Sequence, residues 1–160
     1  KRNFDKVDMG YARRRNLTPF DVLTIASLVE REAAVASERP LIASVIYNRL
    51  RDGIRLDIDA TTRFVTGNWE EPLKVSELQN PDPYNTRVHY GLPPGPIGSP
   101  GLASIKAAAR PAKTDYIFYV VAVCGNGKHR FAETDAEFAR YVAEYDQARA
   151  ERGGRSPTNC

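Results

Sequence analysis

The strongest constraint on the fold of this chain is the stretch from residue 84 to residue 101, which reads YNTRVHYGLPPGPIGSPG. Six of the eleven prolines fall between Pro81 and Pro100, and residues 91–101 carry no charged side chain. Proline fixes φ and glycine permits positive φ, so the backbone here has few alternative paths. A solvated linker normally contains Ser, Glu or Lys and needs no fixed path. The stretch therefore predicts a stiff loop that forms one wall of a binding site.

Two amphipathic helices are predicted before this loop. Thr18 as N-cap, Pro19 at the first helical position and Asp21 in the first turn mark the start of a helix that runs to about residue 34. Its apolar stripe consists of Val22, Ile25, Ala26, Val29 and Ala33. A second helix is expected to begin at Pro40 and to end at Gly53. Its apolar face consists of Leu41, Ile42, Val45, Ile46 and Leu50.

Shorter elements surround the Pro/Gly-rich loop. Residues 54–58 alternate between apolar and polar and predict a short strand, after which Asp59 is expected to cap a short helix. Ser76 is expected to cap one further turn of helix. Ser99 with Pro100 predicts the start of an Ala-rich helix, which ends at Pro111.

The C-terminal third predicts a hairpin followed by a helix. Residues 116–123 are β-branched and aromatic and predict a buried strand, which turns at residues 125–127 and returns from His129. Thr134 with Glu137 predicts a capping box at the start of a last helix, which runs to about residue 152. Residues 153–160 are expected to be loosely held. This order of elements predicts an α+β fold, with a helix-dominated core, a small antiparallel β-hairpin and a long Pro/Gly-rich loop.

Length and composition exclude several classes of function. The 160 residues correspond to one domain, and a net charge of +3 without an aromatic RNA-reading motif argues against a nucleic-acid partner. Cys124 and Cys160 form no CxxC pair and only His89 and His129 accompany them, so no zinc site and no cofactor is predicted. A Cys124–Cys160 disulfide is left open, because it depends on the redox compartment. The longest apolar run, residues 116–124, is too short to span a membrane, so any membrane anchor is expected outside this sequence.

Candidate catalytic groups are two glutamates late in the first helix, Glu30 and Glu32. At about 100° per residue they point about 200° apart, so they cannot face the same cleft. Glu30 is expected at the border of the apolar stripe, where partial desolvation favours the protonated form that a general acid needs, and Glu32 closer to the outer face. The alternative for Glu30 is a solvated residue or an ion-pair partner beside Arg31.

A second polar set resembles the lining of a sugar-binding cleft. Carbohydrates present hydroxyl groups and apolar ring faces together, so uncharged amides and hydroxyls beside aromatic rings are typical of their sites. The alternative for each residue is capping or turn formation, for which Asp59 and Asn85 are well suited. The set consists of Ser44, Asn48, Asp59, Thr61, Tyr84, Asn85 and Thr86.

Together these motifs resemble the catalytic domain of the MltG/YceG-like endolytic murein transglycosylases. The matching pieces are most of LTIASLVEREAAVASERPLIASVIYNRL at 23–50, DGIRLDIDATTRF at 52–64, YNTRVHYGLPPGPIGSPGLASIKAAARPA at 84–112, and the hairpin motif GKHRF at 127–131. They occur in order over nearly all of residues 18–145. The resemblance implies a linker at 1–17 that follows a missing LysM-like subdomain, a catalytic domain at 18–152 and a tail at 153–160. It also implies a bacterial enzyme of the cell membrane, tethered by one N-terminal helix, with the catalytic domain outside.

The resemblance places the catalytic glutamate at Glu30. The implied substrate is a peptidoglycan glycan strand, cleaved between MurNAc and GlcNAc to leave 1,6-anhydroMurNAc ends, and peptidoglycan synthases are candidate partners. The predicted substrate-binding residues are Asn48, Asp59, Tyr84, Asn85, Thr86, Pro94 and Gly95, without a metal. Two alternatives stay open: a water-using muramidase with Asp59 or Glu32 as second carboxylate, and a non-catalytic peptidoglycan-binding scaffold.

Overall fold

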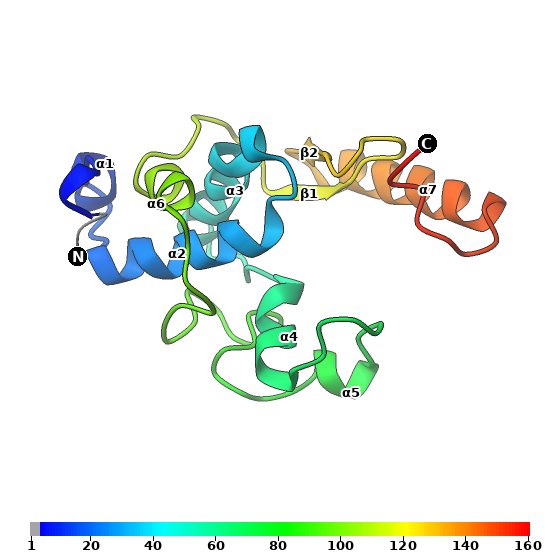
Figure 1. Ribbon diagram of the computed structural model, residues 1–160, viewed down its shortest axis with the longest axis horizontal. Helices are drawn as coiled ribbons and strands as arrows, with labels where there is room; N and C mark the ends of the chain where they lie inside the picture. Colours follow the sequence, from blue (N-terminus) through cyan, green and yellow to red (C-terminus); the bar gives the residue numbers. More distant parts are fainter. Residues whose placement is uncertain (1–3) are drawn as a thin grey trace.

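A bundle of helices joined to a small antiparallel hairpin makes up the computed structural model, which describes residues 4–160 (Figure 1). The helices are α1 (Gly10–Arg13), α2 (Pro19–Glu32), α3 (Arg39–Arg51), α4 (Asp59–Thr66), α5 (Val75–Leu78), α6 (Leu102–Ala109) and α7 (Asp135–Glu151), with 3₁₀ turns η1 (Phe4–Lys6) and η2 (Ala36–Glu38). The hairpin strands are β1 (Phe118–Val121) and β2 (His129–Ala132). The predicted α+β class is confirmed. No helix within residues 4–160 combines the length and apolar composition needed to cross a membrane.

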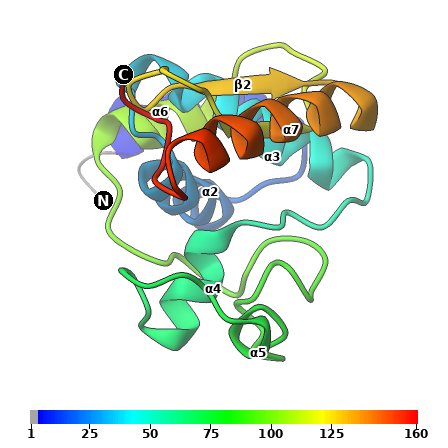
Figure 2. The ribbon, with the colours of Figure 1, turned by 90° about the vertical axis from the view of Figure 1, so that its right-hand side faces the viewer.

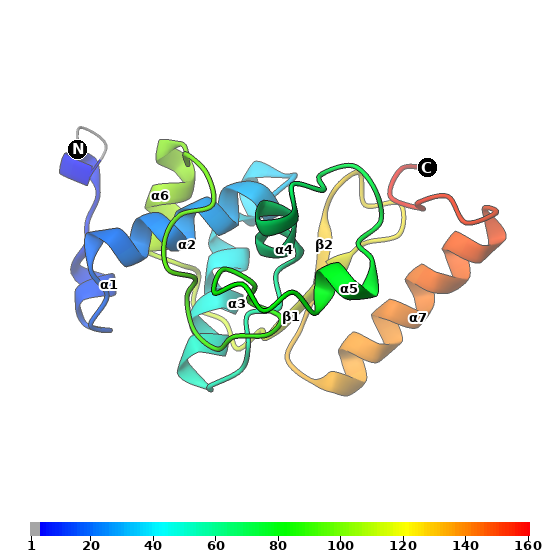
Figure 3. The same ribbon diagram turned by 90° about the horizontal axis from the view of Figure 1, so that it is seen from below.

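Helix α2 lies at the centre of the domain and packs against α6, α3 and α4 (Figures 1 and 3). It begins as predicted, since Thr18 accepts a hydrogen bond from Asp21 N and the Asp21 carboxylate accepts one from Thr18 N. Every residue from Thr24 to Val29 is buried, which is wider than the single stripe that the sequence predicts. The reason is that α2 has neighbours on most of its sides, so its polar residues Thr24 and Ser27 are buried with the apolar ones.

Helix α3 and the N-terminal segment complete the core. As predicted, α3 contains Pro40 in its first turn and ends just before Gly53, whose φ of +65° suits glycine. Within the described part of the predicted 1–17 linker, Met9 and Ala12 are buried in the core. The first three residues of that linker lie outside the described residues.

The short strand predicted at residues 54–58 is wrong. Leu56 and Ile58 are buried and Asp57 is exposed, as the alternation predicts, but the part of the chain that the structure describes contains no partner strand for this segment. Asp57 has a φ of +55°, and the segment is instead bonded through Asp57 N to Thr86 O at 3.1 Å and Ile58 N to Thr86 Oγ1 at 3.0 Å. Alternation reports which side is buried, whereas a strand also needs a neighbour with free backbone groups.

Three predicted helix caps are wrong. Asp59 is the first residue of α4 rather than its cap, and its side chain binds elsewhere. The residue before α5 is Lys74, not Ser76, and Glu77 accepts its N–H at 2.7 Å. Helix α6 starts after Gly101, whose backbone is still extended, rather than after Ser99.

The hairpin and α7 form the end of the molecule opposite α1 (Figures 1 and 2). Strands β1 and β2 pair antiparallel with Phe118 opposite Ala132, and β1 is only half-buried rather than buried as predicted. Thr134 caps α7 through Glu137 N, but the Glu137 carboxylate reaches Glu133 N, so the predicted capping box is only half-formed.

The C-terminal tail is not loosely held, in contrast to the prediction. Cys160 forms a disulfide with Cys124 in the hairpin turn. Backbone bonds from Cys124 N to Pro157 O and from Asn126 N to Thr158 O, both 2.9 Å, fix the same segment. The disulfide that the sequence leaves open is therefore formed, whereas the backbone bonds of the polar tail have no signal in the sequence.

Candidate active site

The Pro/Gly-rich loop lies along α2, as its predicted role as a wall requires (Figure 3). Ile97 N donates to Ser27 Oγ at 3.0 Å, and Ser27 Oγ donates to Thr24 O at 2.7 Å. These bonds fix the middle of the loop to the middle of the helix. Gly98 comes next and has no side chain, so the loop passes close to Arg31: an added Cβ atom would lie 3.6 Å from the Arg31 Nε.

Glu30 lies where the last turn of α2, the end of this loop and α6 meet. Its Oε2 accepts a hydrogen bond from Ser104 Oγ, and Arg39 Nε donates to the same Ser104 Oγ at 3.1 Å. Arg39 Nε is also 4.0 Å from Glu30 Oε2. The Arg39 donor orients the Ser104 hydroxyl toward the carboxylate, so one carboxylate oxygen is fixed in place.

The other face of the Glu30 carboxylate opens into a hollow. The hollow has a volume of about 260 Å³ and is lined by Ser27, Glu30, Arg31, Gly98 and Ser99. The Glu30 side chain is 38% exposed, so the carboxylate keeps part of its contact with water. Gly101 lies above the carboxylate, where an added Cβ atom would be 3.9 Å from both oxygens. The bare glycine therefore leaves room for an oxygen atom of a ligand to approach Glu30.

Glu32 occupies the opposite, closed side of α2. Tyr119 Oη donates to its Oε2 at 2.9 Å, and burial raises the pKa of Glu32, with the charge of Asp59 acting in the same direction. Burial also raises the pKa of Tyr119. The sequence predicts Glu32 nearer the outer face, and this is wrong because the hairpin covers that face. The prediction that the two glutamates point into different spaces agrees with the structure.

A buried pair fixes the hairpin beside Glu32. Glu38 Oε2 is 2.8 Å from His129 Nδ1, and Glu38 Oε1 accepts a hydrogen bond from His129 N at 2.9 Å. Both side chains are 8% exposed. The His129 ring packs edge-on against Tyr119, with 5.3 Å between centroids. The hairpin is therefore attached to η2 by a buried polar pair next to Glu32.

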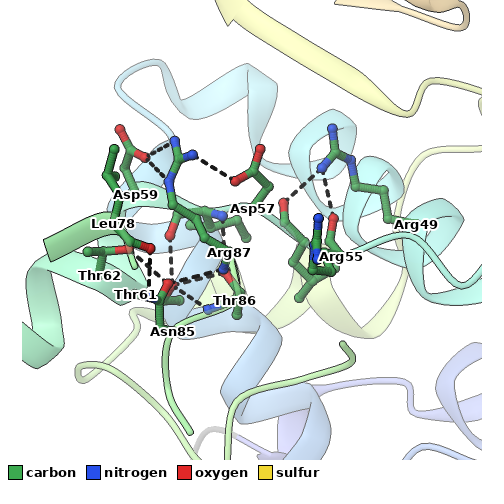
Figure 4. Close-up of polar contacts among 12 residues, drawn as sticks. Arg49, Arg55, Asp57, Asp59, Thr61, Thr62, Leu78, Asn85, Thr86 and Arg87 are labelled. Carbon is green, nitrogen blue, oxygen red and sulfur yellow. Dashed lines mark hydrogen bonds and ion pairs between the residues drawn. The ribbon is translucent and has the colours of Figure 1, made fainter. Parts of the chain in front are cut away.

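Asn85 and Thr86 bind neighbouring segments of the chain (Figure 4), and neither lines the hollow at Glu30. Asn85 is fully buried, and its amide donates to Leu78 O at 3.0 Å and Asn80 O at 2.8 Å while its oxygen accepts from Thr62 Oγ1 at 3.1 Å. Thr86 Oγ1 accepts from Ile58 N. With these groups occupied, both residues act as a frame that positions the loop following them.

Asp59 and Asn48 are also engaged within the protein. The Asp59 carboxylate accepts from Arg87 Nη2 at 2.6 Å and Nε at 3.0 Å, and Arg87 also binds Asp57 (Figure 4). Asn48 donates to Thr114 O at 2.8 Å and Tyr116 O at 2.9 Å, which fixes the segment leading into β1. Neither residue lines the hollow at Glu30.

Tyr84, Pro94 and Gly95 lie on an aromatic surface at the other end of the loop. An added Cβ atom at Gly95 would lie 3.1 Å from Tyr84 Oη and 3.2 Å from Phe20 Cζ, so both rings close on the bare glycine. The Tyr84 ring also contacts Phe64, with centroids 5.1 Å apart. Phe20 and Phe64 are largely exposed, as is Pro94. Exposed rings on a fixed backbone are suited to stacking against apolar faces of sugars.

Several site residues escape the sequence analysis. Ser104, Arg39 and Gly101 are not in the predicted site, although all three contact or border Glu30. Ser104 could have been noticed as the only hydroxyl in an otherwise Ala-rich helix. Arg39 and Gly101 carry no comparable signal, because their roles depend on how α3 and α6 pack against α2.

Comparison with known proteins agrees with the predicted resemblance. The sequence model of the YceG-like family matches residues 1–144. A Bacillus subtilis (strain 168) protein named endolytic murein transglycosylase is 34% identical over 140 residues, which cover 88% of this chain and 38% of that protein. A Streptococcus pneumoniae (serotype 2, strain D39) protein of the same name is 36% identical over 138 residues, which cover 83% of this chain and 25% of that protein.

A solved structure shows the same fold. The crystal structure of a putative YceG-like protein from Listeria monocytogenes superimposes with a TM-score of 0.73 at 34% identity. The match covers 81% of this chain and 41% of that one. The present chain thus spans less than half of the length of each of these relatives.

Proposed function

The chain belongs to the YceG-like family, and we propose that it cleaves peptidoglycan glycan strands internally as an endolytic murein transglycosylase, with Glu30 as the single general acid and base. The observation that carries this proposal is the hollow at Glu30. It contains one carboxylate, held by Ser104 on one side and open on the other. The names of the relatives support the substrate class, and the open carboxylate in the hollow supports the choice of Glu30.

In the proposed reaction the carboxyl group of Glu30 first donates a proton and then accepts one. Protonated Glu30 donates its proton to the glycosidic oxygen between MurNAc and GlcNAc as the bond from that oxygen to C1 breaks. The sugar ring acquires oxocarbenium character. Ionised Glu30 then accepts the proton of the MurNAc C6 hydroxyl as its oxygen bonds to C1. The products are a GlcNAc end and a 1,6-anhydroMurNAc end, water is not consumed, and Glu30 regains its proton.

The positions of the other carboxylates favour this mechanism over a water-using muramidase. A hydrolase needs a second carboxylate within about 5–10 Å of the first, facing the same sugar. Glu32 lies on the closed side of α2 with Tyr119, and Asp59 is bonded to Arg87. Neither lines the hollow at Glu30. An intramolecular C6 hydroxyl removes the need for a group that activates water.

The surrounding residues have positioning and binding roles in this proposal. Tyr84 and Pro94 provide contact surface for the sugars, and Gly95 lets the rings close on the loop. Asp59, Asn85, Thr86 and Asn48 act through the frame that fixes the loop and the segment before β1. We further propose an extracytoplasmic location with an N-terminal membrane tether outside this sequence, and contact with peptidoglycan synthases. The Cys124–Cys160 disulfide supports an oxidising compartment.

Digestion of purified sacculi tests the proposal. The wild-type chain is expected to release soluble fragments, and Glu30→Gln, which keeps the size of the side chain, to release none. Mass spectrometry of the fragments should show ends lighter by one water than reducing ends. Binding to sacculi without release by the wild type would favour a scaffold instead, and reducing ends would favour a muramidase.

A further inference from the structure

Arg31 follows Glu30 in the chain and lines the same hollow. Its guanidinium lies over the Trp69 ring, 4.5 Å from the centroid, and beside Gly98, where an added Cβ atom would be 3.6 Å from the Arg31 Nε. Stacking on an indole and contact with the loop hold a guanidinium in one orientation while leaving its planar fork of N–H donors available.

The loop that carries Trp69 is itself fixed. Arg63 Nη1 donates to Asn68 O at 2.8 Å and Glu71 O at 3.1 Å, on both sides of Trp69. Asn68 Oδ1 accepts from Glu71 N at 3.0 Å. Trp69 nevertheless stays 41% exposed. A fixed loop whose tryptophan remains exposed is better explained by support for Arg31 than by burial of the indole.

Arg31 differs from Arg39 and Arg87 in having no acidic partner among the described residues. Arg39 shares Ser104 with Glu30, and Arg87 binds two aspartates. In the stretch from residue 4 to residue 160, Arg31 forms no ion pair and no side-chain hydrogen bond. An oriented guanidinium without a carboxylate, at the rim of a hollow that contains a proposed catalytic acid, is a site for an anion.

We propose that Arg31, supported by Trp69 and Gly98, binds a carboxylate of the glycan strand beside Glu30. This inference rests on the proposed function, because it takes peptidoglycan as the substrate. MurNAc differs from GlcNAc by a lactyl ether, whose carboxyl group is free where the stem peptide has been removed and is an amide where the peptide is attached; the attached peptide carries carboxylates of its own. Arg31 thereby distinguishes MurNAc from GlcNAc next to the bond that is broken, and sets the register of the strand.

Three forms of the strand test this site and separate the two sources of the carboxylate. The first carries intact stem peptides, the second has had the peptides removed and displays free lactyl carboxylates, and the third is the second with those carboxylates converted to neutral amides. Binding of each strand is measured with the Glu30→Gln chain, alone and with Arg31→Gln added, so that the readout does not depend on turnover. Cleavage is measured with the Arg31→Gln and wild-type chains.

The wild-type chain should prefer a carboxylate-bearing strand over the neutral one by about tenfold in kcat/KM, mostly through KM, and Arg31→Gln should abolish that preference. Arg31→Lys should restore part of it, because the charge returns without the planar fork. Preference for the second strand identifies the lactyl carboxylate, and preference for the first alone identifies the stem peptide. Raising the salt concentration should reduce the preference.

A matched control is Arg140→Gln on α7. Arg140 also lies over a ring, that of Tyr141 at 5.3 Å, but its helix α7 packs on the hairpin rather than at the hollow. It should leave both binding and cleavage unchanged. Equal binding of all three strands before and after Arg31→Gln would overturn the inference. A wild-type chain that binds the strands with this preference but releases no fragments would instead overturn the proposed function alone.

Discussion

Glu30 and Glu32 lie two residues apart on α2 and belong to two different environments. Glu30 faces a hollow bordered by the Pro/Gly-rich loop, and its carboxylate is held by Ser104 and Arg39 on one side only. Glu32 is covered by the hairpin, where Tyr119 donates to it and burial raises its pKa. Each carboxylate has one hydroxyl donor, so the two differ mainly in how far each is open to a ligand.

The comparison shows how one helix serves two purposes. Residues i and i+2 point to nearly opposite sides of a helix. At the C-terminal end of α2, Glu30 therefore faces the Pro/Gly-rich loop and Glu32 faces the hairpin. The loop leaves its glutamate open because Gly98 and Gly101 provide no side chains there. The hairpin closes over the other with Tyr119 and His129. We therefore expect Glu30, on the open side, to take part in catalysis and Glu32, on the closed side, to affect the stability of the fold.

The largest difference is expected when each glutamate is replaced by glutamine. Glu30→Gln should lower the rate of glycan cleavage by about 10³-fold or more, because general acid–base catalysis contributes factors on the order of 10²–10⁴. Glu32→Gln should stay within about threefold of wild type. Release of fragments from sacculi by the two purified variants measures this. A comparable loss of cleavage rate in both variants would contradict the different roles assigned to the two glutamates.

Removal of the hydroxyl on the closed side should affect stability. Tyr119→Phe leaves a buried carboxylate without its donor, and the free energy of unfolding should fall by about 2 kcal/mol at neutral pH. Urea unfolding followed by circular dichroism measures it. Tyr116→Phe is the control, since within the described chain the Tyr116 hydroxyl makes no hydrogen bond, and it should cost under about 0.5 kcal/mol. A fall in the cleavage rate of folded Tyr119→Phe would assign Glu32 a part in the reaction.

Removal of the hydroxyl on the open side should affect activity instead. Ser104→Ala frees the Glu30 carboxylate to rotate, and the rate of cleavage should fall by about tenfold, with a smaller effect on unfolding. Ser37→Ala, at an exposed position on η2, is the control and should leave the rate unchanged. Kinetics on isolated glycan strands give the rate. An unchanged rate in Ser104→Ala would show that the carboxylate does not depend on this bond.

The pH dependence of stability should sharpen the assignment of Glu32 as a buried acid. Burial raises the pKa of Glu32 above its ordinary value of 4.5, so ionisation costs folding free energy as the pH rises from about 4.5 through the raised pKa. Glu32→Gln removes this cost and still accepts from Tyr119 through its amide oxygen. The variant should be more stable than wild type at neutral pH, by an amount on the order of 1 kcal/mol, and lose that advantage near pH 4. A constant difference in thermal midpoint across this range would argue against it.

The sequence predicts the elements better than it predicts which side of each is covered. The Thr18 cap, the helix from Pro40 and the hairpin are local patterns, and the structure agrees with them. The exposures of Glu30 and Glu32 are exchanged relative to the prediction, because the hairpin that covers Glu32 lies about ninety residues away in the chain. Composition of the helix alone carries no information about that contact.

In the candidate site, too, the sequence predicts local structure better than long-range contacts. It predicts the Pro/Gly-rich loop as a wall, and the loop lies along α2. Asn85 and Thr86 were expected to face the substrate, yet their polar atoms are occupied by residues from α4 and the turn before them. An amide next to an aromatic ring has the same sequence pattern whether its donors point inward or outward. Only the packed structure distinguishes a frame from a binding surface.

The central claim is that Glu30 acts without a second carboxylate because the substrate supplies its own hydroxyl. Cleavage of glycan strands in oxygen-18-labelled water, followed by mass spectrometry of the new ends, tests it most directly. The account predicts unlabelled 1,6-anhydro ends in every product of the wild-type chain. Reducing ends that carry the heavy oxygen would show that water attacks the sugar, and would contradict it.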